Sequence, residues 1–225
     1  VKRLVLSLIG GGLALALTAC GGPTSTGTTV ASPAASGSTG SAGWDINETS
    51  REALAQGGQF VGSISYPITT WNTLNTTGNE AELVDLEAPI SPAYYDYNGV
   101  GEAILNPDYL VSAKTETNPN LVITLDLNPK AVWNDGEVIG ADDWIATWKA
   151  QNGSNKKFAA ASSDGWNQIS SITAGASQQQ VIITFKTTYP DWTRIVSGGP
   201  ARAEGVATPE LFNDGWKTYQ DAWFT

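Results

Sequence analysis

The sequence changes character at residue 44, and this change limits where a folded core can form. Residues 1–43 contain no aromatic side chain and no charged one apart from Lys2 and Arg3, whereas all nine tryptophans lie between Trp44 and Trp223. Folding depends on burying large apolar side chains, because their burial must offset the entropy that the chain loses. We therefore expect residues 44–225 to form the folded part, which is long enough for one domain or for parts of two.

The beginning of the chain predicts an export signal. Residues 4–17 form a mostly apolar run that follows Lys2 and Arg3. The run is shorter than the about 20 apolar residues that cross a bilayer, but it has the length of the apolar part of a signal peptide. We predict that residues 1–19 are a signal peptide.

The only cysteine stands directly after this run. Residues 17–21 read Leu-Thr-Ala-Cys-Gly and resemble the bacterial lipobox, in which the cysteine receives diacylglycerol. We predict that Cys20 is lipidated and begins the mature protein; the alternative is an ordinary signal peptide with a cysteine near its cleavage site. Each buried CH₂ of an acyl chain contributes about 0.8 kcal/mol, so several chains would anchor the protein stably to a membrane.

Residues 20–43 predict a flexible tether. After Cys20, every residue up to Gly43 except Val30 is Gly, Ser, Thr, Ala or Pro. Such a segment cannot bury enough apolar surface to fold. It is expected to hold the folded part at the outer face of a bacterial cytoplasmic membrane.

Charge and composition exclude several classes of function. The 22 acidic and 12 basic residues give a formal net charge of −10, which argues against binding to nucleic acid. The absence of histidine and the single cysteine exclude a Ser-His-Asp triad, histidine-containing metal sites and intrachain disulfides. We expect neither a metal nor a cofactor.

Hydrophobic periodicity predicts a mixed α/β or α+β domain. The clearest pattern is the alternation of residues 121–127, in which four aliphatic side chains share one face. Similar arguments predict further strands and helices, the strands at residues 59–65, 169–173 and 181–186 and the helices at residues 141–151, 190–196 and from Pro209 onward. These elements do not follow a strict βαβ order.

Three carboxylate pairs are candidates for glycosidase chemistry, which needs two carboxyl groups about 5–9.5 Å apart. The pairs are Asp135 with Glu137, Asp142 with Asp143, and Glu80 with Glu82. Each pair also has a structural explanation, as a turn, as a favourable helix N-terminus and as a solvated face. The aromatic cluster at residues 94–99 is expected either to line a cleft or to close a turn.

Residues 121–150 resemble the signature of the family 5 extracellular solute-binding proteins of ABC transporters, the oligopeptide- and dipeptide-binding group. The signature combines an alternating strand, a Trp-Asn-Asp-Gly turn and an Ala-Asp-Asp helix start, and here its structural residues are Trp133, Asp135, Gly136, Asp143 and Trp148. The segments at residues 57–60, 71–75 and 181–192 also resemble segments of the family and occur in the family's order. Thr76 departs from it, because a proline is expected after Asn75.

The resemblance implies the class II, two-lobed fold of periplasmic binding proteins. Family members are longer, so we interpret residues 44–225 as an N-terminal portion of this fold. The implied function is binding without catalysis: a lipid-anchored receptor binds a solute and delivers it to an ABC permease. We expect the solute to be a peptide; family members also carry sugars, nickel chelates and other solutes, which stay open as alternatives. The alternative that we retain from the carboxylate pairs is a surface-anchored glycan hydrolase.

The family places the loop after residue 75 in the wall of the ligand cleft. Carried over by position, the candidate ligand-binding residues are Thr76, Thr77, Gly78, Asn79 and Glu80. We expect this loop to offer polar side chains and backbone donors to a ligand. The alternative is the ordinary start of a helix, with Asn79 as its cap.

Overall fold

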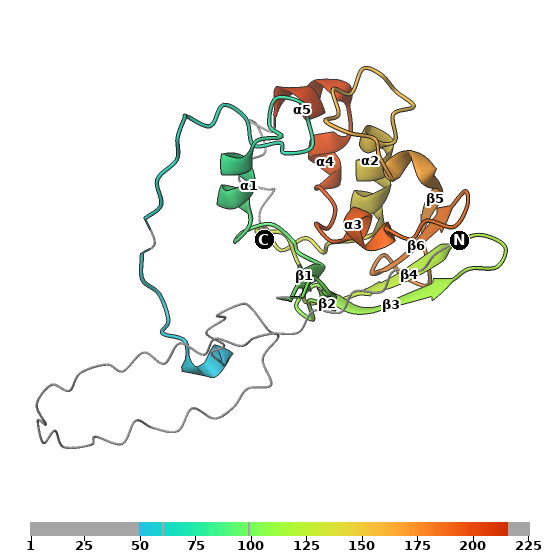
Figure 1. Ribbon diagram of the computed structural model, residues 1–225, viewed down its shortest axis with the longest axis horizontal. Helices are drawn as coiled ribbons and strands as arrows, with labels where there is room; N and C mark the ends of the chain where they lie inside the picture. The colour runs from blue at the N-terminus through green and yellow to red at the C-terminus, as the bar shows by residue number, and fades with distance from the viewer. Residues whose placement is uncertain (1–49, 60, 99, 216–225) are drawn as a thin grey trace, which may run out of the picture. The chain divides into compact units, whose positions relative to one another are not determined.

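The computed structural model describes residues 50–215, except residues 60 and 99 (Figure 1). The predicted signal peptide, the predicted lipidation site Cys20 and the predicted tether lie outside the described residues. Within the described part of the chain, no helix has the length and apolar character needed to cross a membrane.

A four-stranded antiparallel sheet forms the centre of the domain. Its strands lie in the order β3-β4-β6-β5 and comprise β3 (Leu110–Glu116), β4 (Val122–Leu127), β5 (Ile169–Ala174) and β6 (Gln180–Phe185). The predicted strands at residues 121–127, 169–173 and 181–186 are confirmed. The sequence did not reveal β3, because only its first residue is buried and its pattern therefore lacks alternation.

Alternate side chains of the two central strands form the core. Ile123 pairs with Ile183 in the register of β4 and β6, and both are fully buried. Helix α2 (Ala141–Gln151) matches its predicted bounds and packs against this sheet (Figure 1). It contributes Trp144, whose ring meets the buried ring of Tyr94 edge-on at 5.5 Å between centroids.

Short elements surround this core and connect it to the rest of the chain. They are the 3₁₀ turns η1 (Arg51–Ala53) and η2 (Trp166–Gln168), the hairpin β1 (Tyr95–Tyr97) and β2 (Ala103–Leu105), and the helices α1 (Ala81–Glu87), α3 (Trp192–Val196), α4 (Ala203–Val206) and α5 (Pro209–Asp214). Helix α3 begins at Trp192, two residues after the start that the sequence predicts. Helix α5 begins at Pro209 as predicted, and its cap Thr208 accepts a hydrogen bond from Leu211 N at 3.3 Å. The mixed α/β class is confirmed.

The predicted strand at residues 59–65 is wrong. The described residues of this segment have no strand structure, and no described residue forms a β-bridge with them. Val61 is 78% exposed and Ile64 is 46% exposed. A strand requires a neighbour for its backbone hydrogen bonds, and the described residues provide none here.

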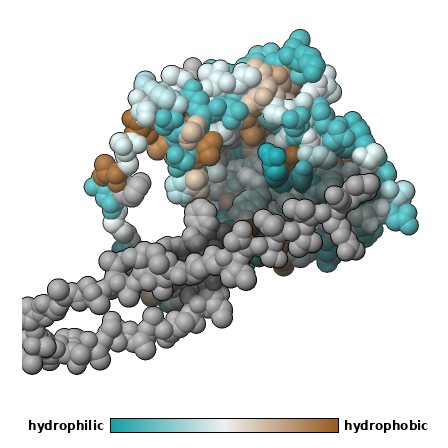
Figure 2. Space-filling view, viewed as in Figure 1, coloured by the Kyte–Doolittle hydropathy of each residue, from teal (hydrophilic) through white to brown (hydrophobic). Residues whose placement is uncertain are grey.

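Exposed apolar side chains gather along this segment and on α1. They include Val61, Ile64, Val84 and Leu86. Figure 2 shows several hydrophobic residues, in brown, among the mostly hydrophilic residues of the face in view.

Candidate functional site

The Trp-Asn-Asp-Gly part of the signature forms a tight turn. Gly136 has a φ of 90°, a value that side chains disfavour, and its N–H donates to Trp133 O at 2.9 Å. Trp133 N donates to Glu137 O at 2.7 Å and closes the turn from the other side. The glycine of the signature is therefore required by the backbone.

Asp143 connects this turn to two other segments. Its Oδ2 accepts hydrogen bonds from Trp133 Nε1 at 3.3 Å and from Gly140 N at 3.0 Å, which caps α2. Its Oδ1 accepts from Ala203 N at 2.8 Å, at the start of α4. Burial raises the pKa of Asp143, whereas these three bonds favour its charged form. The carboxylate thus joins the turn, α2 and α4.

Arg202 lies beside this junction and binds three carboxylates. Its guanidinium is nearly buried and donates to Asp135 Oδ2 at 2.6 Å, Glu137 Oε2 at 2.8 Å and Glu204 Oε2 at 2.6 Å. The pKa of Asp135 is lowered, first by a hydrogen bond from the Glu137 backbone and then by Arg202. The lowered pKa favours the charged form of Asp135, and Glu137 is ion-paired with the same Arg202, whereas a glycosidase needs one carboxyl group that gives up a proton.

The positions of the other two carboxylate pairs also have structural explanations. Asp142 is exposed, whereas its neighbour Asp143 is engaged as described. Glu80 directly precedes α1 and Glu82 lies in its first turn, where the helix dipole favours negative charge. Trp148, the last signature residue, is half-buried against the main core and donates from Nε1 to Trp166 O at 3.3 Å.

The loop at residues 76–80 differs from the expectation in one respect. All five of its backbone N–H groups are already bonded within the protein, with acceptors Ala159 O for Thr76, Asn75 Oδ1 for Thr77 and Gly78, Asn75 O for Asn79 and Gly78 O for Glu80. The expectation that this loop offers backbone donors is therefore wrong, because the buried Asn75 side chain takes up two of them. The side chains of Thr76, Thr77, Asn79 and Glu80 are exposed.

Two details of the loop follow from its packing. Gly78 is buried, and a Cβ at this position would lie 2.1 Å from Asn72 O, so no larger residue fits. The residue that caps α1 is Glu80, and its side chain forms no capping hydrogen bond. Asn79 is therefore not the cap of this helix.

Thr73 and Leu74, which precede this loop in the chain, line two cavities. We call the first the polar cavity: it has a volume of about 320 Å³, and Asn79 is the one residue of the predicted ligand-binding set among the described residues that line it. Most of its other polar and aromatic lining residues come from distant parts of the chain, namely Gln151, Ser162, Asp164, Trp166, Tyr189 and Arg194. Gln151 is buried and donates to Leu74 O at 3.1 Å, which fixes the loop against α2.

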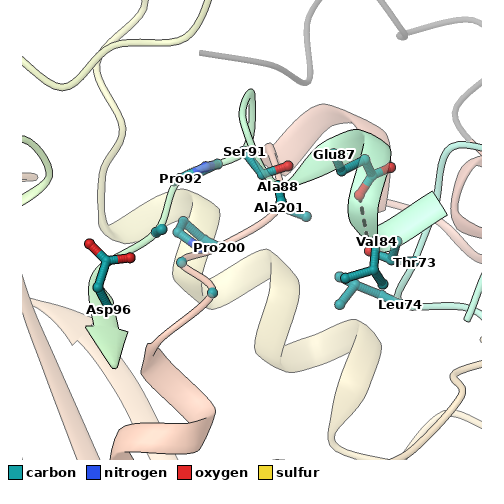
Figure 3. Close-up of a pocket in the computed structure, with 13 residues that line it drawn as sticks. Thr73, Leu74, Val84, Glu87, Ala88, Ser91, Pro92, Asp96, Pro200 and Ala201 are labelled. Carbon is teal, nitrogen blue, oxygen red and sulfur yellow. Dashed lines mark hydrogen bonds between the residues drawn. The ribbon is translucent and has the colours of Figure 1, made fainter. Parts of the chain in front are cut away.

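The second cavity, which we call the Glu87 cavity, has a volume of about 370 Å³ (Figure 3). It lies between α1, the segment that leads into β1 and the segment at residues 198–201. Sequence reasoning missed Glu87 and Arg202, because their surroundings are formed by residues far away in the chain. Among the described residues, no group of three or more side chains is arranged to hold a metal ion.

Comparison with known proteins identifies relatives of the chain. No protein-family model matches the sequence. The oligopeptide-binding protein OppA of Mycobacterium tuberculosis is 31% identical over 173 residues, which cover 76% of this chain and 29% of OppA. The chain thus spans about three tenths of the length of the curated relatives that it matches.

Solved structures show the same fold. The periplasmic EDTA-binding protein EppA matches with a TM-score of 0.62 and 23% identity, over 69% of this chain and 29% of EppA. The oligopeptide-binding protein AppA from Bacillus subtilis, solved with a nonapeptide, matches with a TM-score of 0.56 and 16% identity, over 70% of this chain and 30% of AppA. The described fold is therefore a part of the two-lobed fold of periplasmic binding proteins.

Proposed function

The chain is homologous to the oligopeptide-binding protein OppA, and from this homology we propose that it serves as a lipid-anchored receptor that binds peptides outside the cytoplasmic membrane and delivers them to an ABC permease. The homology over 173 residues carries the proposal. The relatives are binding proteins by name, so the proposed role is binding without catalysis.

The polar cavity supports this proposal. Its aromatic rings and its charged, amide and hydroxyl groups provide both apolar contact and hydrogen bonds, a combination that is typical of small-molecule sites. Asn79 lines this cavity, and Thr76, Thr77 and Glu80 of the same loop are also exposed. Gly78 lets the loop pack closely, and we propose that this loop contacts the ligand. EppA and AppA are named for different solutes, EDTA and oligopeptides, so the shared fold does not determine the ligand. We propose a peptide because OppA is an oligopeptide-binding protein by name.

The glycan hydrolase receives less support. Its best carboxylate pair, Asp135 with Glu137, is bound to Arg202. We propose instead that Trp133, Asp135, Gly136, Asp143 and Trp148 are structural, as their contacts indicate.

Nuclear magnetic resonance tests the proposed binding, because it detects even millimolar affinity. The ¹⁵N-labelled chain is titrated with tri-alanine and, as a control, with maltotriose. We expect tri-alanine to shift the resonances of Asn79, Trp166 and Tyr189. Shifts with maltotriose alone, or no shift with peptides of three to nine residues, would contradict a peptide receptor.

The proposed anchor has its own test. Mass spectrometry of the membrane-extracted protein should show a chain that begins at a diacylated Cys20, and Cys20→Ser should release the protein from the membrane fraction. An unmodified Cys20 in the membrane-bound protein would contradict lipid anchoring.

A further inference from the structure

The Glu87 cavity contains an acidic side chain with one unused oxygen. Glu87 is the last residue of α1 and is only 6% exposed. Its Oε2 accepts a hydrogen bond from Thr73 Oγ1 at 3.2 Å, drawn as a dashed line in Figure 3. Its Oε1 has no hydrogen-bond partner among the residues that the structure describes.

This position is unfavourable for a carboxylate. Burial raises the pKa of Glu87 to about 7, and the bond from Thr73 offsets only a part of this effect. The carboxyl end of a helix carries partial negative charge, and the last turn of α1 contains no basic residue that would compensate it. A buried acidic group that lowers stability and lines a cavity is a candidate for binding.

The lining of the cavity indicates which ligand suits it. Asp96 is the other titratable residue among the described ones that line it, and neither lysine nor arginine is among them. Figure 3 shows Asp96 and Glu87 at opposite ends, with Pro92 and Pro200 between them. The remaining lining is mostly small and apolar, so the cavity favours a cation that also carries an apolar part.

A primary ammonium group meets these conditions better than a metal ion does. Calcium takes six to eight oxygen ligands, and magnesium demands a near-ideal octahedral set. The described residues hold no cluster of three acidic ligands, whereas an ammonium needs few acceptors and brings its own hydrogen-bond donors. A short carbon chain attached to it would contact the prolines.

We propose that the Glu87 cavity binds a primary ammonium group on a short aliphatic chain, with Oε1 of Glu87 as the acceptor of its hydrogen bond. The ammonium belongs to a peptide amino terminus, a lysine side chain or a free alkylamine, and the assignment to a transported solute rests on the proposed function.

The first experiment uses n-butylammonium chloride as the probe and isothermal titration calorimetry with the full 225-residue chain. Glu87→Gln keeps the shape of the side chain and removes its charge. Asp85→Asn removes an exposed charge from the same helix and does not alter the cavity. We expect the wild type and Asp85→Asn to bind butylammonium equally. We expect Glu87→Gln to bind it more weakly, by a factor of about ten at least.

A second readout separates binding from misfolding. Because Glu87 is partly protonated near pH 7, binding of an ammonium should release protons, and the measured heat should change with the ionisation enthalpy of the buffer. Neutral n-butanol should release none. Equal affinity of wild type and Glu87→Gln, or no binding of butylammonium to the folded wild type, would overturn the proposal.

Two peptides identify the source of the ammonium. Tri-alanine offers an α-amine, and acetyl-Ala-Lys-Ala-amide offers a lysine side chain; the one whose affinity falls in Glu87→Gln is the source. If peptides bind but butylammonium binds Glu87→Gln and the wild type equally, the inference fails and the proposed function stands. If butylammonium binding depends on Glu87 while peptides bind both proteins equally, the source is a free alkylamine. If butylammonium binding depends on Glu87 but no peptide binds, the proposed function fails and the inference stands.

Discussion

Two segments of this protein carry β-branched apolar side chains but have different structures. Residues 122–127 form β4, which lies between β3 and β6, and Ile123 is fully buried there. Residues 61–65 also contain β-branched apolar side chains, yet they form no strand, and Val61 is 78% exposed. The comparison teaches that apolar residues make a segment suitable for a strand, whereas neighbouring strands decide whether it becomes one.

The largest expected effect concerns Trp133, in the tight turn that follows β4. Trp133→Ala removes a buried ring and leaves Asp143 without its indole donor. We expect a loss of about 3–5 kcal/mol in the free energy of unfolding. Urea denaturation followed by circular dichroism measures it. A loss below about 1 kcal/mol would mean that the signature tryptophan does not stabilise the fold.

The central pairing itself provides the next test. Ile183 is fully buried opposite Ile123, so Ile183→Ala leaves a cavity between β4 and β6. We expect it to lower the free energy of unfolding by about 2–5 kcal/mol in the same assay. If this loss of stability is only as small as that of truncating an exposed isoleucine, the distinction between the paired strand β4 and the unpaired residues 61–65 is wrong.

The same contrast explains how much of the fold was predictable. Strands β4 and β6 and helix α2 follow from local periodicity, because their neighbours bury one face of each. The strand at residues 59–65 was predicted wrongly, since the sequence does not state whether a neighbouring strand exists. Strand β3 was missed for the opposite reason: it pairs with β4 although only Leu110 in it is buried.

The candidate site was less predictable than the fold. The sequence pointed to the loop at residues 76–80, but Asn75 and Ala159 already accept hydrogen bonds from its backbone. Arg202 lies 67 residues from its partner Asp135, and Glu87 receives its hydrogen bond from Thr73, 14 residues away. Contacts at such separations depend on the tertiary structure, which a local motif does not reveal.

A pH-dependent test compares the buried carboxyl group with the exposed ones. The pKa of Glu87 is raised from 4.5 to about 7, so the folded state holds its proton more tightly than the unfolded state does. Stability from this group is therefore present below pH 4.5 and is lost as the pH rises to about 7. We expect Glu87→Gln to gain about 1–3 kcal/mol relative to the wild type over this range.

Denaturation at pH 5 and pH 7.5 measures this difference, with Asp85→Asn as the exposed control. A relative stability of Glu87→Gln that does not change with pH would show that the carboxyl group is solvated, in contrast to its 6% exposure.

The smallest effect belongs to the unpaired segment. Ile64 is 46% exposed and forms no β-bridge with the described residues, so Ile64→Ala removes little buried surface. We expect the free energy of unfolding to change by less than about 0.5 kcal/mol, as is usual for surface substitutions. Together with Ile183→Ala, this is a matched pair: the same side chain is truncated once with strand neighbours and once without. A loss above about 2 kcal/mol at Ile64 would show that the segment is packed like β4, and the distinction between the two regions would then fail.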